Sequence, residues 1–90
     1  MKSLSPKKQE QRRLQQRLLT TLQQLSPPPD SDHLPPQAEW PSTRQLADSH
    51  DISIYKARNL LLDMAKNGKV IVTGRPVNNT LRWYPSYRDR

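Results

Sequence analysis

The sequence predicts a mainly helical α+β fold, a winged helix-turn-helix with three helices and a small antiparallel β-hairpin. Two observations within residues 42–84 predict this class. Two capped helical patterns, STRQLADS and SIYKARNLLLDMAKNGK, follow one another with only a tight turn between them. A hairpin pattern follows directly as VIVTG, RPVNN and TLRWY. This order of elements is typical of a helix-turn-helix that carries a wing.

Length and composition predict one small domain. The chain has 90 residues, of which 32% are hydrophobic, and we assign residues 1–85 to the domain and 86–90 to a frayed tail. The absence of cysteine excludes disulfides and a cysteine-based zinc site. No stretch is apolar and long enough to span a bilayer, and the basic start is followed by a Gln-rich helix rather than a signal segment. We expect a soluble cytoplasmic protein, most simply from a bacterium or a mobile element.

The charge of the chain is unevenly distributed. Its formal net charge of +7 divides into +5 for residues 1–25, −3 for residues 26–41 and +5 for residues 42–90. Two basic segments that flank an acidic loop suit an anionic partner such as a nucleic acid. A solvated, mildly basic surface would give the same totals.

Residues 6–26 are predicted to form the first helix. Ser5 and Pro6 suit its cap and its first position, and the proline run from Pro27 ends it. Four leucines recur at helical spacing, namely Leu14, Leu18, Leu22 and Leu25. This stripe can pack on its own domain or form a dimerising coiled coil. The first is favoured because the stripe covers only about two heptads.

Residues 27–41 are predicted to be a proline-rich, acidic loop. A loop of this length in a small domain is either functional or loosely ordered. Its last residues, Gln37–Trp40, are expected to pair as a short strand against the hairpin, with Trp40 packed on the core. Asp30, Asp32 and His33 resemble metal ligands, but no fourth ligand accompanies them, so a flexible acidic loop is favoured and no cofactor is expected.

The second helix is predicted to begin at Ser42, with Gln45 completing a capping box. The turn Ser49-His50-Asp51 follows, and Ser53 caps the third helix, which ends near Lys66 at the signal Asn67-Gly68. In the third helix, six side chains share the face expected in the core: Ile54, Ala57, Leu60, Leu61, Met64 and Ala65.

The polar side of the third helix is the candidate nucleic-acid surface. A helix in the major groove reads bases with its N-terminal turns, and Asn, Lys and Tyr there can contact bases and phosphates. The candidate residues are Ser53, Tyr55, Lys56, Arg58 and Asn59. An ordinary solvent-exposed helix face would also be polar. Asp63 disfavours deep insertion of the C-terminal half because phosphates repel a carboxylate.

Two further segments are candidates for contacts with the DNA backbone. Thr43 and Arg44, at the start of the second helix, offer a hydroxyl, a guanidinium and free N–H groups to phosphate, although a simple cap explains this start equally well. In the hairpin, Arg75 is the charged side chain expected at the tip, in the minor groove or on phosphate. Asn78 and Asn79 are expected to serve the turn.

The hairpin strands are predicted at Val70–Val72 and Thr80–Tyr84, with Pro85 ending the second. Leu81 and Trp83 are expected to alternate with outward-facing Arg82 and Tyr84.

The segment STRQLADS, the run IYKARNLLLDMAKNGKV and the strand LRWYP resemble the small winged-helix regulators of enterobacterial fimbrial operons, the PapI/FaeA type. The resemblance covers about half of the chain. It implies a transcriptional regulator that acts at promoter DNA, often together with a global regulator, the leucine-responsive regulatory protein. A plasmid or phage regulator would fit these residues as well.

The expected function is therefore DNA-binding transcriptional regulation. An enzyme is not expected, because the two histidines, His33 and His50, belong to no catalytic constellation in the sequence. The main alternative is a protein-interaction adaptor that binds a partner through the N-terminal leucine face or the proline-rich loop. RNA binding is less favoured because the aromatic residues form no evident stacking platform.

Overall fold

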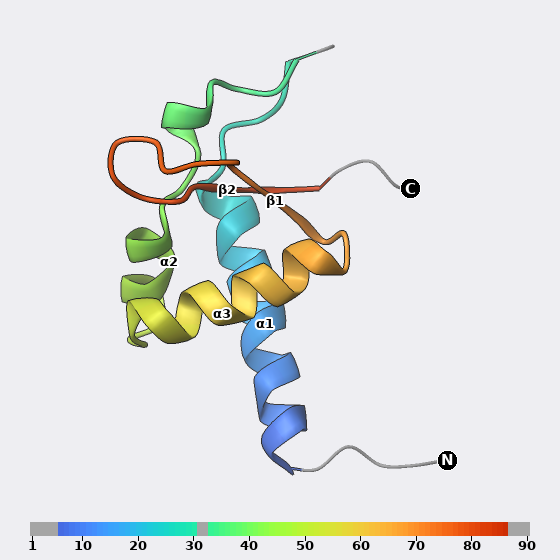
Figure 1. Cartoon of the computed structure of the whole chain (residues 1–90). Helices are drawn as coiled ribbons and strands as arrows, with labels where there is room; N and C mark the ends of the chain where they lie inside the picture. The colour runs from blue at the N-terminus through green and yellow to red at the C-terminus, as the bar shows by residue number, and fades with distance from the viewer. Residues whose placement is uncertain (1–5, 31–32, 87–90) are drawn as a thin grey trace.

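A computed structural model describes residues 6–30 and 33–86 of the chain. These residues form three α-helices and a two-stranded antiparallel sheet, so the predicted mainly helical α+β class is confirmed. In chain order the elements are α1 (Pro6–Leu25), the 3₁₀ helix η1 (Gln37–Glu39), α2 (Thr43–Ser49), α3 (Ile54–Lys66), β1 (Val70–Val72) and β2 (Trp83–Pro85). In Figure 1, α3 crosses α1, α2 lies beside them, and the strands lie near the C-terminal end of α1.

The ends of α1 agree with the local signals in the sequence. The helix begins at Pro6 and ends at Leu25, one residue before the predicted end. Three predictions lie outside the described residues: the cap at Ser5, the acidic side chain of Asp32 and most of the tail, residues 87–90.

Only the C-terminal half of α1 is buried in the domain. Leu18 and Leu22 are fully buried, and Leu14 and Leu19 pack partly against the same core. By contrast, residues 6–13 are all exposed, and this end of the helix runs past α3 in Figure 1. The leucine stripe therefore packs within its own domain, so the leucines that a coiled coil would need are already used.

Both helices of the predicted helix-turn-helix begin at their predicted caps. Ser42 Oγ accepts a hydrogen bond from the N–H of Gln45 (3.1 Å), and Gln45 Oε1 accepts one from the N–H of Ser42 (2.8 Å), which completes the capping box. Ser53 Oγ caps α3 by accepting from the N–H of Lys56 at 3.0 Å. Between the helices, Asp51 adopts a left-handed φ of 54°, a conformation that Asp tolerates better than most residues.

The core lies where the three helices meet the sheet. Its buried members are Leu18, Leu22, Leu46, Ala47, Ala57, Leu60, Leu61, Met64, Val70 and Trp83. The predicted core face of α3 is thus observed from Ala57 onward, with Ala65 partly buried. Ile54 is the exception: its side chain is 41% exposed, because it stands at the first position of α3, beyond the reach of the core.

The strand β1 pairs with β2 in the register Val70↔Pro85, Ile71↔Tyr84 and Val72↔Trp83. The return strand is therefore later than predicted and includes Pro85. The predicted alternation is wrong at Tyr84, which is fully buried like its neighbour Trp83. Both faces of β2 are covered, Trp83 lying in the helical core and Tyr84 meeting the proline-rich loop.

The proline-rich loop covers the second face of the sheet. The Tyr84 hydroxyl donates to the carbonyl oxygen of Pro27, and the Trp40 ring lies 5.2 Å from the Tyr84 ring. Trp40 Nε1 in turn donates to the carbonyl oxygen of Pro35 at 2.9 Å. The two ends of this loop therefore contact the domain, through Pro27 on one side and Trp40 on the other, and Trp40 is buried as expected, on the side of Tyr84.

The strand predicted at Gln37–Trp40 is wrong, since η1 occupies this segment. The N–H groups of Glu39 and Trp40 donate to the carbonyl oxygens of Pro36 (2.9 Å) and Gln37 (3.1 Å), so the turn itself uses the groups that a strand ladder would need. The pairing with the hairpin occurs two residues later. Ser42 forms an isolated antiparallel bridge with Arg82, supported by a hydrogen bond from the N–H of Thr43 to the carbonyl oxygen of Leu81 (3.2 Å).

Within residues 6–30 and 33–86, no helix has both the length and the apolar character needed to cross a membrane.

Candidate nucleic-acid interface

The first two turns of α3 carry four of the eight predicted site residues, and all four are exposed. Tyr55 is the most exposed of the large hydrophobic side chains among the described residues, with 76% of its surface accessible. Lys56, Arg58 and Asn59 are also exposed. Ser53 lies directly before them, and its hydroxyl is used as the helix cap. The predicted face is therefore accessible, with the Ser53 side chain holding the helix start.

These exposed residues form a polar ridge with a cation on each side. At 100° per residue, Tyr55 and Asn59 lie close together along the helix, 40° apart in projection. Lys56 and Arg58 project about 160° apart and flank this ridge. The opposite side of α3 is closed by the buried core residues Ala57 and Leu61. The helix thus presents one convex, cation-flanked surface to solvent.

The start of α2 offers less to an anion than its sequence predicts. Thr43 is only 4% exposed, and its hydroxyl accepts a hydrogen bond from Trp83 Nε1 (2.8 Å) and donates one to the carbonyl oxygen of Leu81 (3.2 Å). The N–H groups of Ser42, Thr43 and Gln45 are also bonded within the domain. The prediction of a free Thr43 hydroxyl and free N–H groups is therefore corrected, and Arg44 remains the exposed candidate at this helix.

The predicted residues of the hairpin lie at and before its tip. Asn78 and Asn79 have φ values of 56° and 69°, and Val77 bridges Thr80 around them. These two left-handed residues form the tight tip, as their residue type predicted. Arg75 is exposed, but it precedes this tip by three residues instead of standing at it.

Arg82 fixes the base of the wing. Its Nε donates to the carbonyl oxygen of Val77 (3.1 Å) and its Nη1 donates to that of Trp40 (2.9 Å). This arginine is half-buried, so its positive charge is used inside the fold. It positions the loop that carries Arg75 relative to the segment before α2.

A groove beside the ridge brings α1 into the same region. Lys7 and Arg17 of α1 border it on one side, and Lys56 and Asn59 of α3 border it on the other. The cavity has a volume of about 450 Å³. Only the α3 residues were in the predicted site. The signal for Lys7 was in the sequence: it lies seven residues before Leu14 on the same helix face.

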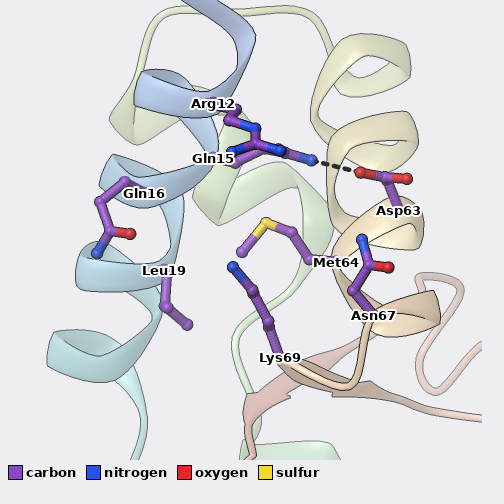
Figure 2. A pocket seen from close by; sticks show the side chains of 8 residues that line it. All are labelled: Arg12, Gln15, Gln16, Leu19, Asp63, Met64, Asn67 and Lys69. Atoms are coloured by element: carbon purple, nitrogen blue, oxygen red, sulfur yellow. Dashed lines mark hydrogen bonds between the residues drawn. The ribbon is translucent and has the colours of Figure 1, made fainter. Parts of the chain in front are cut away.

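A second groove lies on the other side of the crossing between α1 and α3, and Figure 2 shows its lining. Arg12 and Lys69 border it together with the carboxylate of Asp63. Gln15 Nε2 donates to Asp63 Oδ2 (3.0 Å) and to the carbonyl oxygen of Leu60 (3.2 Å), which ties the two helices together. The charged residues that line this groove are two cations and Asp63, whereas those of the first groove are three cations and Glu10.

The acidic loop shows no ligand set in the part of the chain that the structure describes. No group of three His, Asp or Glu side chains there is arranged to hold a metal ion. Asp30 and His33 bond each other through their backbones, the N–H of Asp30 donating to the carbonyl oxygen of His33 at 2.9 Å.

Comparison with known proteins gives no relative of this chain. A scan of protein-family models, a search of curated proteins and a search of solved structures each found no match.

Proposed function

We propose that this chain is a winged helix-turn-helix protein that binds double-stranded DNA and regulates transcription. One observation carries the proposal: the first two turns of α3 present Tyr55, Lys56 and Asn59 to solvent while the opposite face is closed on the core. Side chains at the start of an exposed, rigidly packed helix are those that read base edges when such a helix enters the major groove.

The order of elements supports the winged-helix assignment. A capped α2, a tight turn at Asp51 and a capped α3 are followed by a hairpin with a two-residue tip. The bridge between Ser42 and Arg82 adds a third short pairing beside the hairpin, directly before α2. This pairing anchors the hairpin to the helix pair, as a wing requires if it is to contact the same duplex.

The charges around the ridge support a duplex as the ligand. Lys56 and Arg58 flank Tyr55 and Asn59 on opposite sides, which matches the two phosphate strands that border a major groove. Arg44 and Arg75 are exposed on neighbouring elements and would contact the phosphate backbone beyond it. The Thr43 side chain has no part in this interface because its hydroxyl is used in the core.

The cellular setting rests on the sequence alone. A bacterial, cytoplasmic regulator that acts with a second protein, such as the leucine-responsive regulatory protein, follows from the resemblance to fimbrial regulators. The adaptor alternative is weaker in one of its two forms, because Leu18 and Leu22 of the α1 leucine face are buried in the domain's own core.

Fluorescence anisotropy with a labelled duplex of mixed sequence tests the proposal. We expect affinity to fall steeply with salt, and Lys56→Ala and Arg75→Ala to reduce the slope of log affinity against log salt by about 0.9 each, the value for one lost phosphate contact. Asn59→Ala should leave this slope unchanged and weaken binding to a duplex selected from a random pool.

Lys66→Ala is the matched control for Lys56→Ala. It removes the same charge from the same helix, ten positions or about 15 Å further along. If only the N-terminal turns enter the groove, this variant should change the slope by much less. Equal losses for Lys56 and Lys66 would contradict the assigned face, and no duplex binding at low salt would favour an adaptor.

A further inference from the structure

We infer that the groove bordered by Lys7 and Arg17 of α1 and by Lys56 and Asn59 of α3 binds one sugar–phosphate strand of the bound duplex, with Lys7 and Arg17 as phosphate-binding residues. This inference rests on the proposed DNA-binding function and extends its interface to a helix outside the helix-turn-helix. This cavity, the α1–α3 groove, has a volume of about 450 Å³.

The N-terminal end of α1 extends past the core. Residues 6–13 are all exposed, a length of about 12 Å at 1.5 Å per residue. A helix that served only to close the core would begin near Leu14, because Leu14 is the first residue of α1 that packs on the core. The projecting part lies beyond α3 (Figure 1), next to the end of the ridge rather than over the sheet.

The residue type changes along one face of α1. Leu14, Leu18 and Leu22 face the core, and the same face continues through Gln11 to Lys7 at helical spacing. The stripe therefore turns from apolar to polar and basic where the helix leaves the core. The face of the projecting part that borders α3 thus carries polar and basic side chains, next to the leucines Leu14 and Leu60 at the floor of the groove.

The charged side chains that border the α1–α3 groove are mainly cations. Three cations border it, Lys7 and Arg17 from α1 and Lys56 from α3, against the single carboxylate of Glu10. The volume is in the range of about 300–1,000 Å³ in which proteins hold small ligands or parts of larger ones. A phosphodiester strand carries one negative charge per nucleotide and would release bound counterions on entering such a groove.

The width of the major groove leaves room for only one helix. The major groove of B-DNA is about 12 Å wide, and an α-helix with its side chains is about 10–12 Å across, so one helix fills it. When α3 occupies the groove, α1 cannot enter beside it. The projecting part of α1 must then lie over the phosphate strand at the groove edge, with Lys7 on the projecting part and Arg17 on the packed part of α1, both bordering the same groove.

The groove on the opposite side of the helix crossing provides the contrast (Figure 2). Arg12 and Lys69 border it, but the Asp63 carboxylate opens into it and is held there by Gln15. A carboxylate in this position repels a phosphate strand. Each groove is bordered by one carboxylate, but the α1–α3 groove has three cations and this groove has two. Removing two cations from each groove should therefore weaken DNA binding more at the α1–α3 groove.

The experiment compares two double variants of the full chain with the wild type. Lys7→Gln with Arg17→Gln empties the α1 wall of the α1–α3 groove, and Arg12→Gln with Lys69→Gln removes the same charge from the other groove. All four side chains are exposed, so both proteins should fold, which circular dichroism checks. Binding of a mixed-sequence duplex is measured by anisotropy over a range of salt concentrations.

We expect the first pair to reduce the salt slope by about 1.8, which is 0.9 for each of two lost phosphate contacts, and the second pair to reduce it by less than half as much. Equal slopes for the two pairs would overturn the inference while leaving the DNA-binding proposal intact, provided that Lys56→Ala still weakens binding. If the wild-type chain shows no salt-dependent duplex binding, both the inference and the proposed function are wrong.

Discussion

At Thr43 one hydroxyl group joins three parts of the domain. It stands at the first position of α2, accepts the indole N–H of Trp83 from β2 and donates to the carbonyl oxygen of Leu81. Trp83 is fully buried, so its N–H has no access to water if this acceptor is removed. A residue that looked available for phosphate in the sequence thus has a structural role, and only the pairing of residues 40 positions apart reveals it.

Thr43→Val should therefore destabilise the protein without weakening DNA binding. Valine keeps the shape of threonine but leaves the Trp83 N–H unpaired, at a cost of about 1–3 kcal/mol in the free energy of unfolding. Urea denaturation measures this change. The control is Thr20→Val on the exposed side of α1, where the lost bond is to Gln16 within the same helix and the cost should stay below about 0.5 kcal/mol.

Two outcomes would contradict this role for Thr43. Unchanged stability of Thr43→Val would mean that the buried hydrogen bonds contribute nothing. A loss of duplex affinity in the folded variant would return the hydroxyl to the DNA interface.

At the scale of elements, α1 has two halves with different tasks. Its C-terminal half closes the core through Leu18 and Leu22, and its first eight residues, 6–13, project with every side chain exposed. The same leucine spacing would also suit a coiled-coil seam, in which Leu25 would be buried along with Leu22. In the structure Leu18 and Leu22 are fully buried in the core of their own chain and Leu25 is 44% exposed, so the two inner leucines of the stripe are not available to a second chain.

Leu22→Ala and Leu25→Ala test this division. Truncating the fully buried Leu22 should lower the free energy of unfolding by about 2–5 kcal/mol, because it leaves a cavity in the core. Truncating Leu25 should cost less than about 1 kcal/mol, since its side chain is already partly in water. Losses of similar size, accompanied by concentration-dependent melting, would instead indicate a dimer built on the leucine stripe.

Local signals were sufficient for the helices and the turn at the wing tip. The capping box at Ser42, the cap at Ser53 and the two asparagines of the tip depend on neighbours within a few residues, so the sequence displays them. The burial of Tyr84 could not be predicted in this way. It depends on Pro27, 57 residues away, and the proline-rich loop had no periodic pattern to show which surface it covers.

At the scale of the whole molecule, cations from two distant parts of the chain meet at one groove. Lys7 and Arg17 from α1 border it together with Lys56 from α3, while Arg58 and the hairpin residue Arg75 are exposed elsewhere on the surface. The acidic loop packs instead on β2, through Tyr84 and Trp40. The sequence predicted the α3 part of this surface from helical periodicity. It did not show the contribution of α1, because the crossing of two helices is a tertiary feature.

The most direct test of the account is an NMR titration of the ¹⁵N-labelled full chain with mixed-sequence duplex DNA at low salt. We expect the largest amide shifts at Ser53–Asn59, at the projecting part of α1 and around Arg75, with small shifts in residues 33–40 of the covering loop. Shifts confined to that loop, or no shifts at all, would contradict the claim that the exposed start of α3 is a DNA-binding surface.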